Sequence, residues 1–281
     1  MDSLDLHALI RPRPTEDPLR FTLEVPDGLQ QGRGAWGGVA SGAMVAAAQL
    51  VDPRPEMAVR TLSAQLVAPV LVGTMHLAVE ELRRGSATHT MSVRCTDGGG
   101  ALLAHGVVVL GAARAGDAIP DGPQWLGVRP PAELSAGPWA VPEAPVGPPL
   151  APDFAVHLEM RPISGLPYMG AEVDETLGWV RPRGPVGRVD ASVVTALADA
   201  WWVAAMARFD RPRPAATVGY TLDFPTDPTC VTRDADGRME PLLHRGHSVA
   251  AREGFTTEVR ELWTRTGQLV SWNTQTVVVI R

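Results

Sequence analysis

The chain has 281 residues, is 45% hydrophobic and carries a formal net charge of −6. This length suits two domains of ordinary size, and the acidic balance leaves no basic footprint for nucleic acid, which we exclude as a partner. The two cysteines, Cys95 and Cys230, are far apart and form no staple or metal pattern, so we expect a cytoplasmic protein. The N-terminal stretch lacks the apolar run of a secretory signal, and no apolar window is long enough to span a membrane.

The first half of the chain predicts one strand, one helix and then four more strands. Residues 20–26 (RFTLEVP) are a strand candidate, and a glycine-rich turn, QGRGAWGG, follows. The apolar run 39–52 predicts a helix that Pro53 and Pro55 end. Alternation of apolar and polar residues then predicts strands at 59–69, 73–85, 86–98 and 101–114.

A segment dense in Pro, Gly and Ala separates the halves. It is far longer than the roughly 4–6 residues of an ordinary connection within a domain. We interpret it as an interdomain linker, partly extended, with Trp125 and Trp139 packed on a neighbouring surface. A disordered tail between unrelated domains is the alternative. The expected domains are therefore an N-terminal unit at 1–115, the linker at 116–152 and a C-terminal unit at 153–281.

The second half repeats the order of the first. It predicts a helix at 190–209 (DASVVTALADAWWVAAMARF), ended by Pro212 and Pro214, and strands at 154–164, 175–184, 216–226, 247–255, 256–267 and 268–281. A helix that is apolar on nearly all sides must be covered all round, and a curled antiparallel sheet does this. We therefore expect an α+β fold, a tandem (double) hotdog in which each half wraps an antiparallel sheet around one long central helix.

Several stretches resemble type II acyl-CoA thioesterases. In the second half these are LGWVRPRGPVGRVDASVVTALADAWW, AATVGYTLDF and GQLVSWNTQTVVVIR. In the first half, WGGVASGAMVAAAQL and VRTLSAQLVAPV are similar to the family's Gly-Gly helix entry and its next strand. The resemblance covers most of the chain outside the linker, and it implies hydrolysis of acyl-CoA thioesters to free acid and coenzyme A.

Carried over by position, the resemblance places the catalytic acid at Asp199, with its threonine at Thr217 and its glutamine at Gln275. The sequence departs from the family at Gly219 and Tyr220, where the family often has an Asp-His pair. This departure leaves the shape of the acyl or pantetheine pocket open.

The chemistry of these residues fits hydrolysis. A buried carboxylate needs donors, which the Thr217 hydroxyl and the Gln275 amide supply. Thr195 and Asp199, four residues apart, share one face of the predicted helix. We expect the three groups to hold a water, with Asp199 taking its proton during attack on the thioester carbonyl. The alternatives are a capping or solvent-facing acid, an ordinary strand threonine and a core glutamine.

Gly37 and Gly38 open the first predicted helix. They form either a tight turn with positive φ or a helix N-terminus whose N–H groups polarise the thioester oxygen opposite Asp199. Trp36 beside them is either core or a wall of the acyl tunnel. The first helix, GAMVAAAQL, carries no acid, so we expect one active site per chain.

Arg83, Arg84 and Arg183 are candidate contacts for the phosphates of coenzyme A, with solvated surface charge as the alternative. His244 and His247 lie three apart in an expected loop or strand edge, without the acid or Cys cluster of a metal site. We therefore expect no metal and no cofactor other than the coenzyme A of the substrate. The chain has no GxSxG motif, which argues against a serine hydrolase.

Two other functions stay open. One is a hotdog hydratase or dehydratase for enoyl- or hydroxyacyl-CoA, whose chemistry usually needs an Asp and a His near the helix. No His lies within or just after the second helix. The other is a protein that binds an acyl-thioester without turnover. The expected partner is an acyl-CoA small molecule, with no nucleic acid or membrane, and paired sheet edges favour a homodimer or a higher homo-oligomer.

Overall fold

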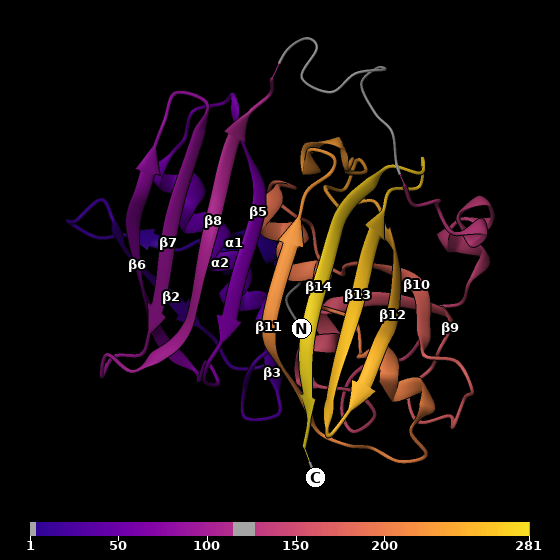
Figure 1. Ribbon diagram of the computed structural model, residues 1–281. Helices are drawn as coiled ribbons and strands as arrows, with labels where there is room; N and C mark the ends of the chain where they lie inside the picture. Colours follow the sequence, from indigo (N-terminus) through magenta and orange to yellow (C-terminus); the bar gives the residue numbers. More distant parts are fainter. Residues whose placement is uncertain (1–3, 115–126, 281) are drawn as a thin grey trace.

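The computed structural model describes residues 4–114 and 127–280. Within these residues one antiparallel sheet of twelve strands runs through both halves, in the order β1-β2-β6-β7-β8-β5-β11-β14-β13-β12-β10-β9 (Figure 1). The halves join where β5 (Met57–Leu66) pairs with β11 (Ala215–Asp223). None of the described helices is both long and apolar enough to cross a membrane.

The first half of the sheet wraps around helix α2 (Gly37–Val51), whose residues from Gly38 to Ala48 are all buried. This burial explains why the helix is apolar all round. A short helix α1 (Leu6–Ile10) precedes it. The other strands of this half are β1 (Arg13–Pro14), β2 (Arg20–Val25), β6 (Gly73–Arg84), β7 (Thr88–Thr96) and β8 (Leu102–Ala112), with a separate small hairpin of β3 (Gln30–Gln31) and β4 (Gly34–Ala35).

The second half wraps around helix α3 (Ala191–Ala198). Its other strands are β9 (Leu158–Ser164), β10 (Glu175–Pro182), β12 (Leu242–Arg252), β13 (Phe255–Trp263) and β14 (Leu269–Val279). Short 3-10 helices lie at η1 (Ala132–Ala136), η2 (Pro138–Ala140), η3 (Asp153–His157), η4 (Ala204–Arg208) and η5 (Pro228–Cys230). The two halves thus confirm the predicted double hotdog.

The second helix is much shorter than the predicted range 190–209. It ends at Ala198, Asp199 is its C-cap, and the chain turns before η4 begins. Two buried side chains of β13 take over the backbone groups that a longer helix would use. Arg260 Nη1 donates to the carbonyl of Ala198 at 3.2 Å, and Glu258 Oε2 accepts from the Ala204 N–H at 2.7 Å. The prediction that one continuous helix carries Asp199 in its middle is therefore wrong.

Strand β12 begins earlier than the predicted range 247–255. His244 and His247 both lie inside it, and β12 is an internal strand between β13 and β10. The His244 ring is fully buried and stacks on Trp201, with 5.0 Å between ring centroids. The prediction that these histidines lie in a loop or at a strand edge is therefore wrong. His244 belongs to the core because an aromatic ring covers it.

Helices α2 and α3 pack directly on each other in opposite directions. A Cβ at Gly42 would lie 3.1 Å from the carbonyl of Ser192, so glycine allows this close approach. Near the other end, a Cβ at Gly38 would lie 2.6 Å from the carbonyl of Ala196. The start of α2 in the first half therefore meets the end of α3 in the second half.

The described part of the predicted linker covers the sheet of the second half. Val128, Leu134 and Val141 pack on a buried cluster that includes Trp179 and Trp263. The neighbours of these tryptophans along the strands face α3 instead, so the covered face is the one turned away from the helix. Trp139 lies over the guanidinium groups of Arg161 and Arg181, while Trp125 falls outside the described residues.

Candidate active site

Asp199 is buried at the junction of the two halves, with 6% of its surface exposed. As the C-cap of α3 it faces the first turn of α2. Its Oδ1 accepts a hydrogen bond from Gln275 Nε2 at 3.1 Å and lies 3.8 Å from Arg260 Nη1. The carboxylate therefore has the donors that a buried charge requires.

Gln275 links Asp199 to Thr217. The Thr217 hydroxyl donates to Gln275 Oε1 at 2.8 Å, and Gln275 Nε2 also donates to Asn273 Oδ1 at 2.8 Å. These hydrogen bonds orient the Gln275 amide so that its NH2 group points to Asp199. The structure thus brings the three predicted residues into one hydrogen-bonded chain, in which Thr217 reaches Asp199 through Gln275.

A β-bulge in β11 lies next to Thr217. The pairing with β14 shifts by one residue between Thr217 and Gly219. A glycine inside a strand is typical of such a bulge. Tyr220 follows, fully buried, with its hydroxyl donating to the carbonyl of Thr195 at 2.8 Å. Tyr220 therefore ties β11 to α3.

Burial raises the pKa of Asp199 to about 6. The positive charge of Arg260, the hydrogen bond from Gln275 and the backbone N–H of Gly38 oppose this rise, and the negative charge of Glu258 adds to it. A carboxyl with this pKa is mostly ionised at pH 7, yet it holds a proton far better than an exposed one. This is the behaviour that a general base needs.

Gly37 and Gly38 both have helical backbone and form the first turn of α2. The interpretation as a turn with positive φ is therefore wrong, and the physical reason for glycine is space. A Cβ at Gly37 would lie 2.7 Å from Asp199 Oδ2 and 2.6 Å from Leu66 Cδ1. Only glycine lets the backbone N–H groups of this helix start come so close to the acid.

Trp36 lies in the core rather than in the wall of the cavity beside Asp199. It is 2% exposed, stacks on Phe154 with 4.8 Å between centroids, and directs its Nε1 to the carbonyl of Ala196 at 3.4 Å. It therefore ties the start of α2 to the second half, as the core alternative proposed.

A cavity of about 500 Å³ opens beside these groups. Asp199, Thr217 and Gly37 reach its wall, and both halves contribute to it. Most of the remaining wall is small or apolar, including Ala35, Ala40, Leu66, Val70, Leu103, Ala104, Ala215 and Ala216. This lining suits an acyl chain better than a highly charged ligand.

The three arginines proposed for coenzyme A phosphates lie elsewhere. Arg183 donates to Glu143 at 2.6 Å and to the carbonyl of Leu158, and Arg84 pairs with Glu81. Arg83 is exposed on β6, and none of the three lines the cavity. The arginine in the cavity wall is Arg33, which the sequence analysis missed although it stands in the glycine-rich turn before α2.

A second pair of functional candidates was also missed. Glu258 and Arg260 are 0% and 2% exposed, and they contact each other behind Asp199. They lie on the same face of β13 as buried Leu262, at every second position of the strand. This two-residue spacing was the only sign in the sequence that Glu258 and Arg260 are buried. It was easily missed, because charged residues in a strand usually face solvent.

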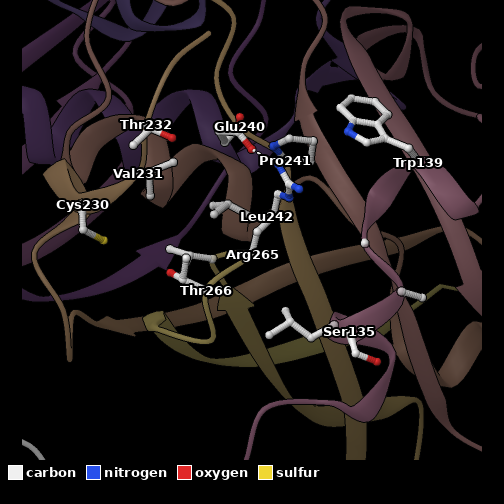
Figure 2. Close-up of a pocket in the computed structure, with 14 residues that line it drawn as sticks. Ser135, Trp139, Cys230, Val231, Thr232, Glu240, Pro241, Leu242, Arg265 and Thr266 are labelled. Carbon is white, nitrogen blue, oxygen red and sulfur yellow. Dashed lines mark hydrogen bonds and ion pairs between the residues drawn. The ribbon is translucent and has the colours of Figure 1, made fainter.

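A second hollow, of about 600 Å³, lies beside the predicted linker and contains no predicted site residue (Figure 2). Ser135 and Trp139 come from that segment, Cys230 from η5, and Arg265 from the turn before β14. Arg265 pairs there with Glu240 at 2.9 Å. The chemistry-bearing residues therefore gather at the first cavity, not here.

Comparison with solved structures confirms the architecture. A hot dog fold protein of unknown function from Alicyclobacillus acidocaldarius is 21% identical, with a TM-score of 0.79 over 97% of each chain. A putative thioesterase II from Thermobifida fusca is 19% identical, with a TM-score of 0.74 over 98% of this chain and 97% of that chain. The dehydratase domain of RzxB from Pseudomonas fluorescens is 14% identical, with a TM-score of 0.58 over 98% and 99%. At these identities the likeness shows the fold alone.

Family comparison is more specific. No curated protein matches the chain. The acyl-CoA thioesterase N-terminal domain matches residues 25–113, and the acyl-CoA thioesterase C-terminal domain matches residues 130–279. The two matches follow one another along most of the chain, so this double-hotdog protein belongs to the acyl-CoA thioesterase family.

Proposed function

We propose that the protein hydrolyses acyl-CoA thioesters to free acid and coenzyme A, with Asp199 as the general base. The observation that carries the proposal is the chain from Thr217 through Gln275 to Asp199, which meets an apolar cavity beside the first turn of α2. As the setting we propose the fatty acid metabolism of the cytoplasm, in keeping with the free thiols of Cys95 and Cys230.

The proposed reaction needs no metal and no covalent intermediate. A water held between Asp199 and Thr217, whose side chains Gln275 orients, attacks the thioester carbonyl carbon, and Asp199 takes its proton. The carbonyl oxygen becomes negative and is stabilised by N–H groups of the first turn of α2. When the C–S bond breaks, the proton returns from Asp199 to the thiolate. The products are the free acid and the thiol of coenzyme A, and the base is restored.

The geometry disfavours the hydratase alternative. That chemistry usually needs a histidine near the acid, yet no histidine is among the residues that line the cavity in the described part of the chain. His244 is sealed in the core against Trp201, where burial lowers its pKa well below the usual value. It therefore stays neutral and has no path to a substrate.

The test is an acyl-CoA panel assayed with a thiol-reactive dye. We expect thiol release by the wild type and its loss in Asp199→Asn. The matched control is Asp52→Asn, because Asp52 is a buried acid that caps the end of α2 and should leave thiol release in place. Loss of double-bond absorbance without thiol release would instead indicate a hydratase. Tight binding with neither change would indicate a non-catalytic binder.

A further inference from the structure

The buried ion pair behind Asp199 has no part in the proposed reaction. Arg260 places Nη1 3.8 Å from Asp199 Oδ1, and its Nε donates to Glu258. Glu258 in turn accepts from the backbone N–H of Ala204. Both side chains are fixed between α3 and η4, and neither is among the residues that line the cavity.

Such a pair is costly to bury, and an apolar pair of similar volume would often serve the fold equally well. Its arrangement relative to Asp199 is asymmetric. Asp199 and Glu258 share one guanidinium, so the three groups carry a net charge of −1 when Asp199 is ionised and zero when it is protonated. The charge of Arg260 favours the ionised acid, and the charge of Glu258 opposes it.

The other groups that face this cluster do not carry the effect. Tyr220 approaches from β11 and His244 from β12. Burial raises the pKa of Tyr220 and lowers that of His244, so both are neutral near pH 7. From α2 the neighbour is the N–H of Gly38, and Arg33 is an exposed residue of the cavity wall. The two buried charges nearest Asp199 are those of β13.

We propose that Arg260 and Glu258 are opposed positioning residues, which end α3 at Asp199 and together set the ionisation of that acid. The proposal rests on the proposed function only for the catalytic use of Asp199. The electrostatic claim itself concerns the folded protein without substrate. It predicts that removing either charge moves the titration of Asp199, and that the two removals move it in opposite directions.

The direct test is ¹³C NMR of protein labelled at the aspartate carboxyl carbons. The Asp199 signal is the one that Asp199→Asn lacks. In Arg260→Met we expect its titration midpoint to rise by about one pH unit or more, as expected when an opposite charge at this distance is removed. In Glu258→Gln, which keeps an oxygen for Ala204, we expect the midpoint to fall. Arg260→Lys keeps the charge and should stay close to the wild type.

The matched control is Arg181→Met. Arg181 is also buried and pairs with Glu159 at 2.7 Å, outside the Asp199 site, so its loss should not move the Asp199 signal. If thiol release is found, the acidic limb of its pH profile should shift with the NMR midpoint. If Arg260→Met does not fold, the downward shift in Glu258→Gln still tests the pair.

Each outcome separates the two proposals. Opposite shifts without any thiol release would support the positioning pair and refute the hydrolase. An unmoved midpoint in folded variants, or a shift of the same sign in both, would overturn the pair whether or not the protein hydrolyses acyl-CoA.

Discussion

Replacing Asp199 with Asn should stabilise the fold while it abolishes thiol release. Burial raises the pKa of this acid from 3.8 to about 6, so folding opposes its ionised form. At about pH 8 the difference, 6 − 3.8 = 2.2 units, corresponds to about 3 kcal/mol. The amide replaces one accepting oxygen by a donor, which costs about 1–2 kcal/mol. We therefore expect the free energy of unfolding to increase by roughly 1–2 kcal/mol.

The pH dependence distinguishes this cause from better packing. A raised carboxyl pKa makes the wild type lose stability as the pH rises from about 3.8 to about 6, so little of the effect is present below that window. Urea unfolding at about pH 8 and pH 5 measures it, and about half of the electrostatic part should remain at pH 5, since 5 − 3.8 = 1.2 of the 2.2 units.

For the control variant Asp52→Asn we expect the opposite change in the free energy of unfolding. Arg54 holds the pKa of buried Asp52 well below its usual range, so Asp52→Asn should lose stability at both pH values. A variant Asp199→Asn that is less stable than the wild type at pH 8, or equally stabilised at pH 5, would refute this reasoning.

The remaining predictions concern activity. Thiol release should rise with pH through a midpoint near 6, because Asp199 must be ionised to accept a proton; a flat profile from about pH 5 to 8 would contradict this. Thr217→Val removes the donor to Gln275 Oε1 and should lower kcat about 100-fold in the same assay, while Thr217→Ser should retain most of it. Gly37→Ala forces a Cβ to 2.7 Å from Asp199 Oδ2, so we expect it to cost about 1–3 kcal/mol in urea unfolding and to reduce thiol release. Gly98→Ala, with open space around it, should change neither.

Much of the fold was predictable because each half repeats the same local pattern. The apolar run of α2, and the alternation in β6, β7 and β8, predicted those elements close to their observed bounds. Asp199, Thr217 and Gln275 came from the resemblance to a family, since none of these residue types is distinctive alone. Their hydrogen-bonded chain depends on the pairing of β11 with β14, which the sequence does not display.

The end of α3 was not predictable from its own residues. Nothing in the segment ALADAWWVAAM breaks a helix, and its propensity favours continuation. The helix ends where Arg260, 62 positions further along the chain, donates a hydrogen bond to the carbonyl of Ala198. The burial of His244 was not predictable for a similar reason, because it depends on stacking against the ring of Trp201, which is distant in sequence. In both cases a contact distant in sequence overrides a clear local preference.

The pairing of β5 with β11 has a consequence for how the two halves depend on each other. Separating them would leave two long strand edges with unpaired backbone groups, a surface prone to aggregation. It would also divide the proposed reaction centre, with the first turn of α2 on one fragment and Asp199 on the other. Under the proposed function neither half would be active alone, and a chain divided between the halves would have to re-form the β5–β11 pairing before it could hydrolyse acyl-CoA.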